Sequence, residues 1–165
     1  MPAWLLTDIK EHQRTVCIDQ CGVGRELGDV QRVLAGASLV GLDASEEAIV
    51  EARRRYPDYR FRVDTADFDR AFDVCVQLEA TVQRSKLGPA LARLAGMSRR
   101  AVVVTLAEGS IAPGDLPLVI GDGFSLVHAE RAGDARQWLV ATWVHAEIAA
   151  LYALPAGESL PALLS

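Results

Sequence analysis

The chain has 165 residues, of which 50% are hydrophobic and 24% are charged. This length and composition are typical of one folded globular domain and exclude a disordered chain. The net charge of −5 gives no general attraction to phosphate backbones or anionic lipids, which argues against nucleic acid as a partner.

Short apolar runs alternate with helical patterns along the chain up to residue 108. Residues 1–14 are expected to form an N-terminal helix. The runs that favour strands are residues 15–19, 38–43, 59–63, 72–78 and 101–106. The segments with helical periodicity are residues 26–35, 46–56 and 87–94, with Gly96 ending the last of them. This alternation is typical of a parallel sheet with crossover helices.

The last part of the chain has a different pattern. Glycines and prolines between residues 109 and 123 leave room only for a short helix. Residues 124–130 and 137–145 favour two strands around a short loop, which permits direct antiparallel pairing. We therefore expect a single domain over residues 1–165, with its core sheet in residues 15–145 and a helix and tail in residues 146–165.

The cysteines and the apolar segments bear on where the protein works. Cys17, Cys21 and Cys75 are an odd set without CxxC spacing, which argues against a zinc site and a disulfide framework. No segment approaches the ~18 apolar residues of a membrane span, and the N-terminus lacks the apolar stretch of a signal peptide. We expect a cytoplasmic protein with no membrane partner, and the excess of arginine over lysine suggests a GC-rich bacterial genome.

The turn after the first strand, in the stretch TVCIDQCGVGREL, suggests a nucleotide site. Gly22, Gly24 and Gly28 permit unusual backbone angles and let a ligand approach the main chain without meeting a Cβ. Asp43 lies 19 residues after Gly24, at the end of the second strand, where a carboxylate can accept hydrogen bonds from both hydroxyls of a ribose. A strand-end aspartate that only caps the following turn would leave the same pattern.

Two ligand classes fit this turn, namely dinucleotides of the NAD type and S-adenosylmethionine. Asp64 follows the third strand in VDTAD, placed to meet the amino group of an adenine, and FDVCVQLE opens the fourth strand. An NAD-dependent oxidoreductase would need a second domain to present its substrate to the nicotinamide. These features favour S-adenosylmethionine.

The order of these residues resembles that of the class I S-adenosylmethionine-dependent methyltransferases. The segments VCIDQCGVG, LVGLDASEEAIVEARRRYP, FRVDTADFD and AFDVCVQLE carry the resemblance, over residues 15–108. It implies an α/β fold with a three-layer, Rossmann-like, doubly wound and mostly parallel seven-stranded sheet of order 3-2-1-4-5-7-6, ending in an antiparallel hairpin. It also implies S-adenosylmethionine as cofactor, S-adenosylhomocysteine as product, and transfer of the methyl group to oxygen or nitrogen of a small-molecule acceptor.

The resemblance assigns cofactor contacts to positions at the carboxyl ends of four strands. These positions are Asp19, Gln20, Cys21, Gly22, Gly24, Asp43, Ala44, Asp64, Thr65, Gln77 and Leu78. The two glycines would let the backbone pass close to the methionine portion and the ribose. Asp43 would hold the ribose hydroxyls, with Ala44 beneath the adenine and Asp64 and Thr65 at its edge. The last two positions would line the sulfonium side, near the acceptor.

The chain also departs from the family pattern. The acid that the family places three residues before the cysteine falls on Ile18, and Asp19 lies one residue later, where strand alternation directs it to the opposite face unless a bulge re-aims it. Gln20 takes the place of the first glycine of the family, and little chain is available for a substrate lid. These departures keep a second hypothesis open: a methyltransferase-fold binding or scaffolding protein with weak catalysis.

Methyl transfer itself asks the protein mainly to align acceptor, methyl group and sulfur and to exclude water. Glu79, Glu108, His128 and His145 lie near strand ends, but each has an ordinary structural explanation, so the sequence assigns none of them as a catalytic base, and we predict no metal site. Apolar residues near both ends of the chain are expected to pack together as a cover or as a homodimer surface.

Overall fold

The computed structural model describes residues 1–65, 68–80, 84–107, 111–132, 138–152 and 154. Its strands are β1 (Thr15–Asp19), β2 (Ser38–Asp43), β3 (Arg60–Val63), β4 (Phe72–Ala80), β5 (Ser98–Ala107), β6 (Val119–Ile120), β7 (Phe124–Ala132) and β8 (Trp138–His145). Its helices are α1 (Ala3–Glu11), α2 (Leu27–Val33), α3 (Glu46–Arg55), α4 (Arg84–Met97) and α5 (Ala146–Leu151), with a 3-10 turn η1 (Pro113–Asp115).

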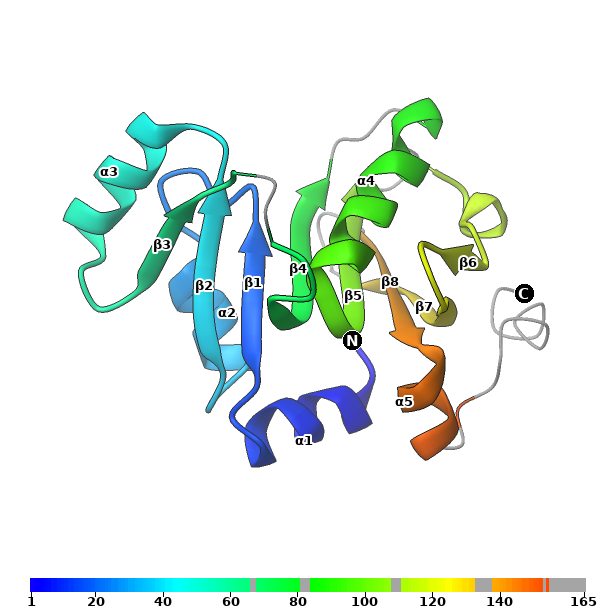
Figure 1. Ribbon diagram of the computed structural model, residues 1–165. Coiled ribbons are helices and arrows are strands. Elements are labelled where there is room, and N and C mark those ends of the chain that lie inside the picture. Colours follow the sequence, from blue (N-terminus) through cyan, green and yellow to red (C-terminus); the bar gives the residue numbers. More distant parts are fainter. Residues whose placement is uncertain (66–67, 81–83, 108–110, 133–137, 153, 155–165) are drawn as a thin grey trace.

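One sheet organises these elements, in the order β3-β2-β1-β4-β5-β8-β7-β6. Strands β1 to β5 are parallel, and their carboxyl ends lie at the top of the sheet in Figure 1. Strand β8 returns antiparallel between β5 and β7. The α/β class, the mostly parallel sheet, the strand order and the C-terminal hairpin are thereby confirmed, with the hairpin strands β7 and β8 as the predicted strands 6 and 7.

The prediction of seven strands was one strand short. Strand β6 pairs with β7 through only two residue pairs, Val119 with Ser125 and Ile120 with Phe124. The turn between them contains Gly121 and Gly123, both with positive φ. Two residues among glycines and prolines show no alternation in the sequence, so this edge strand left no pattern to predict it.

The two faces of the sheet carry different layers of helices. In β1, the alternate residues Val16 and Ile18 pack with the buried side chains of α1, α2 and α3, whereas Cys17 packs with those of α4. Figure 1 shows α2 behind the sheet and α4 in front of it. This alternation places the side chain of Asp19 on the α4 side of the sheet.

Helix boundaries follow local chemistry, with one correction. Ser45 caps α3, because its hydroxyl accepts a hydrogen bond from the N–H of Ala48 (3.1 Å). Gly96 does not end α4, which continues to Met97 and passes directly into β5. A glycine inside a helix costs about 1 kcal/mol, and the buried Leu91 and Leu94 hold this last turn against the sheet. None of the helices in the described residues is long and apolar enough to cross a membrane.

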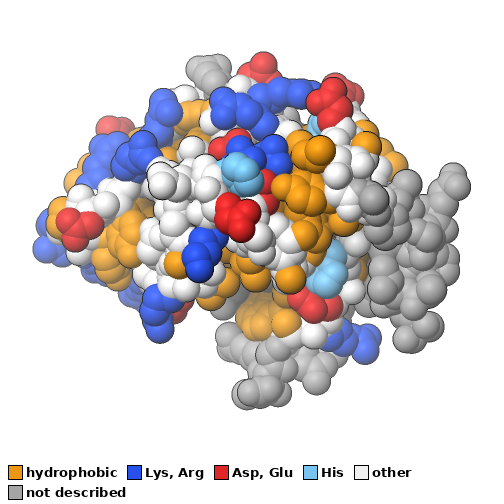
Figure 2. Space-filling model, turned by 90° about the horizontal axis from the view of Figure 1, so that it is seen from below, with side chains coloured by type: hydrophobic (Ala, Val, Ile, Leu, Met, Phe, Trp, Pro, Cys, Tyr) orange, Lys and Arg blue, Asp and Glu red, His pale blue; other side chains and the backbone are white. Residues whose placement is uncertain are grey.

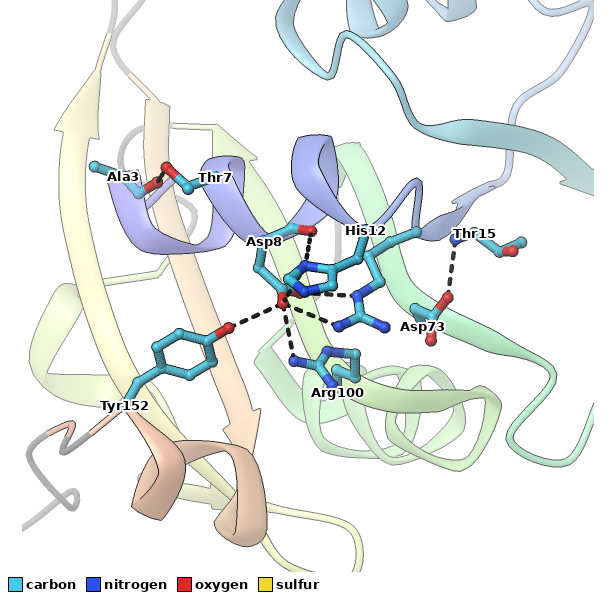
Figure 3. A network of polar contacts seen from close by, with 9 residues as sticks. Ala3, Thr7, Asp8, His12, Thr15, Asp73, Arg100 and Tyr152 are labelled. Atoms are coloured by element: carbon cyan, nitrogen blue, oxygen red, sulfur yellow. Dashed lines mark hydrogen bonds and ion pairs between the residues drawn. The ribbon is translucent and has the colours of Figure 1, made fainter.

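A cluster of polar side chains joins α1, β5 and α5 at the amino ends of the parallel strands (Figure 3). The carboxylate of Asp8, whose side chain is 1% exposed, accepts two hydrogen bonds from Arg14 (3.1 Å each), one from Arg100 (3.1 Å) and one from Tyr152 (2.9 Å). We call these four residues the Asp8 cluster. On the surface at this end, positive and negative side chains are interspersed (Figure 2).

Burial alone would raise the pKa of Asp8. Its donors Arg14 and Tyr152 and the charge of Arg100 act against burial and bring the pKa below its ordinary value. The Asp8 cluster is therefore a buried charge with its partners in place.

Candidate functional site

The turn after β1 has the backbone geometry that its glycines suggested. Gln20, Gly22 and Gly24 have φ angles of 54°, 52° and 80°, which all lie in the left-handed region. Gln20 holds this conformation although a residue with a Cβ disfavours it. The backbone of the turn is therefore left-handed at three positions, of which two are glycines.

The two glycines of this turn serve different purposes. A Cβ on Gly24 would lie 2.8 Å from the ring of Phe61, so this glycine is needed to pack the turn against β3. A Cβ on Gly22 would meet no atom within 4 Å. The main chain at Gly22 is therefore the part of the turn that a ligand can approach.

Asp43 is directed at this open part of the turn. Its Oδ2 accepts a hydrogen bond from the N–H of Gly22 (2.8 Å), and its Oδ1 accepts one from the N–H of Ser45 (2.9 Å). The main chains of the neighbouring strand ends are also joined, since the N–H of Asp64 donates to the carbonyl of Asp43 (2.8 Å). The carboxylate at the end of β2 thus lies beside the turn that follows β1. Through its bond with Ser45 it also caps the turn after β2, which was the alternative explanation for an aspartate at this position.

A cavity of about 290 Å³ lies over the turn. Five of the predicted cofactor residues are among those that line this turn pocket: Asp19, Gln20, Cys21, Gly22 and Leu78. Arg25 and Glu26 contribute charged side chains to its wall. The pocket thus reaches from the carboxyl end of β1 to that of β4.

Arg93 of α4 bridges two of the predicted acids. Its guanidinium donates one hydrogen bond to Oδ1 of Asp19 and another to Oδ2 of Asp64 (2.7 Å). The strand pairs of β1 with β2 and β4 keep a regular register up to this point, so no bulge re-aims Asp19. We call these three residues the Asp19 cluster.

Burial has the largest effect on the pKa of Asp19, whose side chain is 2% exposed. Burial raises the pKa of Asp19 above its ordinary value, and Arg93 offsets only part of that effect. The Arg93 side chain is 37% exposed, so water competes for its guanidinium. No local sequence pattern predicts the role of Arg93, because it lies on a helix and contacts the ends of two strands that are distant in the chain.

Comparison with known proteins identifies the fold. No family model matches the sequence, and no curated relative does. A TehB-like SAM-dependent methyltransferase from Corynebacterium glutamicum is 22% identical, with 81% of this chain and 80% of that chain covered and a TM-score of 0.56. A S-adenosylmethionine dependent methyltransferase from Mesorhizobium loti is 14% identical, with 81% and 91% covered and a TM-score of 0.56. This chain has the class I methyltransferase fold.

The same fold also occurs in a protein named for a different reaction. The [4+2]-cyclase SpnF is 14% identical, with 86% of this chain and 80% of that chain covered and a TM-score of 0.57. A methyltransferase fold therefore does not by itself decide the reaction.

The other six predicted cofactor residues are not among those that line the turn pocket: Gly24, Asp43, Ala44, Asp64, Thr65 and Gln77. Ala44 and Thr65 are exposed directly after β2 and after Asp64. Gln77 is 2% exposed and pairs in register with Asp19, so it is buried on the α4 side of the sheet. The roles of these residues toward a cofactor stay predictions.

Cys21 brings no thiolate to the turn pocket, and His128 and His145 are not among the residues that line it. Burial raises the pKa of the Cys21 thiol to about 12, so the sulfur is a neutral thiol at physiological pH. The side chains of Glu79 and Glu108 lie outside the described residues. Within the described part of the chain, no group of histidine, cysteine and acidic side chains is arranged to hold a metal ion.

Proposed function

We propose that this chain is an S-adenosylmethionine-dependent methyltransferase that transfers the methyl group to an oxygen or nitrogen of a small molecule. The observation that carries this proposal is the Asp43 carboxylate, bonded to the N–H of Gly22 beside a part of the turn with open space above it. In a methyltransferase fold, this is where a ribose and the main chain would meet.

The residues present fit an adenosyl group over the turn. Asp43 would accept hydrogen bonds from the ribose hydroxyls, since each carboxylate oxygen has a second lone pair beyond its present backbone partner. Gly22 would leave room for the ligand because it carries no side chain. Asp64, Thr65 and Ala44 would surround the adenine.

The cofactor, when bound, supplies an activated methyl group on a sulfonium. The chain would contribute alignment and exclusion of water at that group. Leu78 lines the turn pocket at the end of β4, where an apolar side chain displaces water from the transfer site. Asp19, Gln20 and Cys21 would surround the methionine portion from the end of β1.

One observation favours a second candidate, a binding or scaffolding protein with weak catalysis. Arg93 is bonded to both Asp19 and Asp64 and thereby occupies two acids that a cofactor would use. An adenine would have to share Asp64 with this guanidinium. If that competition is strong, the fold would persist while cofactor affinity is low.

Calorimetric titration of S-adenosylmethionine and S-adenosylhomocysteine separates the two candidates. We expect both to bind the wild type, and Asp43→Ala to weaken binding by about 1–3 kcal/mol, the usual cost of leaving buried polar groups unpaired. Asp58→Ala is the matched control, because Asp58 is an exposed aspartate in the loop after α3. Absence of binding at millimolar ligand would leave the scaffolding candidate. Equal affinity of wild type and Asp43→Ala would mean that the ribose is held elsewhere.

A further inference from the structure

A second cavity adjoins the turn pocket and has a different chemical character. This groove has a volume of about 370 Å³. Its apolar walls come from Val30, Val33 and Leu34 of α2, Val76 and Leu78 of β4, and Trp138 of β8. Val33 is 66% exposed although it lines the groove, so apolar surface here is open to a ligand.

The groove and the turn pocket meet at two residues. Leu78 and Glu26 line both cavities. A molecule in the groove can therefore reach the same point as a group held over the turn. Methyl transfer needs this continuity, because the acceptor atom must approach the methyl carbon in line with the sulfur.

The charged groups of the groove are mostly acidic. Glu26 and Asp29 line it, and Asp29 is paired with Arg32. The only cationic group among its described lining residues is the amino terminus of Met1, which donates to Glu130 (2.8 Å). For Glu26, the described residues provide no hydrogen bond or ion pair to its carboxylate. Among the described residues that line the groove, an anionic ligand would find no unpaired cation, whereas an amine would find the carboxylate of Glu26.

We propose that this groove binds the methyl acceptor, and that the acceptor is an apolar small molecule carrying an amine and no acidic group. This inference rests on the proposed function. The apolar body lies between α2 and the sheet beside Trp138, and its nitrogen lies at the junction, where Glu26 accepts an N–H hydrogen bond.

The step that follows is balanced without a further reactant. The bound ammonium would first release one proton to water. The lone pair of the resulting neutral amine would then form the new carbon–nitrogen bond as the methyl–sulfur bond breaks, with the electron pair of that bond going to the sulfur. The nitrogen, now positively charged, releases a proton to the Glu26 carboxylate or to water. Glu26 contacts the acceptor and orients it.

A matched pair of probes tests the class of acceptor. 2-Phenylethylamine and 3-phenylpropionate have the same apolar body and opposite charge at neutral pH. Each is titrated by calorimetry into wild-type protein saturated with S-adenosylhomocysteine. We expect the amine to bind at least about fivefold more tightly, the size of one partly exposed ion pair.

Two variants locate the binding site. Glu26→Gln should remove most of the preference for the amine. Val33→Lys places a cation on the wall of the groove and should reverse the preference. Val50→Lys is the matched control, because Val50 is 59% exposed on α3 and lies outside the groove. Circular dichroism checks that all three variants fold.

The outcomes separate this inference from the proposed function. Preference for the acid, or binding of neither probe while S-adenosylhomocysteine binds, overturns the acceptor class and leaves the methyltransferase proposal in place. An unchanged preference in both groove variants overturns the location. Failure of S-adenosylhomocysteine to bind overturns the proposed function, and the inference about the acceptor with it.

Discussion

Two buried aspartates lie at opposite ends of the sheet, and they differ in their hydrogen-bond partners and in the direction of their pKa shifts. Asp8, at the amino ends of the parallel strands, is held by two arginines and a tyrosine, and its pKa is lowered. Asp19, at the carboxyl end of β1, has one half-exposed arginine, and its pKa is raised because burial outweighs that partner. At the end of the sheet away from the turn, the partners of Asp8 fully offset the effect of its burial on the pKa. At the end beside the turn pocket, Arg93 offsets only part of the effect of burial on Asp19. A buried acid with a raised pKa, such as Asp19, is typical of ligand sites.

The largest expected effect is at the Asp8 cluster. Asp8→Asn keeps the shape of the side chain but removes the charge that two arginines share. Breaking a buried ion pair in this way costs about 3–5 kcal/mol. Urea unfolding monitored by circular dichroism measures the loss, with Asp58→Asn as the control. A loss below about 1 kcal/mol, the range of surface pairs, would mean that the cluster is not a stability centre.

The pH dependence of Asp8 has a definite sign. Because its pKa is lowered on folding, its contribution is present above the ordinary aspartate value of 3.8 and is lost as the pH falls through the lowered value. The stability difference between wild type and Asp8→Asn should therefore shrink on going from pH 6 to pH 3. Unfolding curves across that range test this. A difference that grows toward acid pH would contradict the assigned direction.

Arg93→Gln should have an intermediate effect. It leaves the Asp19 carboxylate without its cation, and an uncompensated buried polar group costs about 1–3 kcal/mol. Because folding raises the pKa of Asp19 above 3.8, the loss should increase as the pH rises through that raised pKa, where the variant would keep an unpaired charge. Arg99→Gln is the control, because Arg99 is an exposed arginine near the start of β5. Equal stability of Arg93→Gln and Arg99→Gln would show that the bridge in the Asp19 cluster contributes nothing.

Asp19→Asn should have the smallest effect on stability, below about 1 kcal/mol. Replacing an acid whose pKa is already raised by a neutral amide removes the cost of burying its charge. Arg93 still has Asp64 and water as hydrogen-bond partners. The same urea experiment measures it beside Asp8→Asn. Equal losses in the two variants would remove the contrast between the two ends of the sheet.

The fold was largely predictable because its signals are local. Apolar runs predicted the parallel strands, and helical periodicity over residues 46–56 predicted α3. Strand β6 was not predicted because a strand of two residues shows no alternation of apolar and polar positions. The prediction that the helix ends at Gly96 was wrong because the packing of Leu94 outweighs the low helix propensity of one glycine.

The site was predictable only in part. The left-handed turn and the place of Asp43 beside it follow from the glycine pattern and from strand order. The partners of Asp19 and Asp8 do not, because Arg93 and Arg100 lie 74 and 92 residues away in the chain. Such pairs depend on how helices pack against the sheet, and single residues of ordinary type give no sign of them.

The most direct measurement is the change of backbone amide resonances when S-adenosylhomocysteine is titrated into the labelled protein. The N–H groups of Gly22 and Ser45, which both donate to Asp43, should shift most. The N–H of Thr15, which donates to Asp73 near the Asp8 cluster, should stay in place. Shifts confined to Thr15 and its neighbours, or no shift at Gly22 and Ser45 at millimolar ligand, would contradict an adenosyl site over the turn.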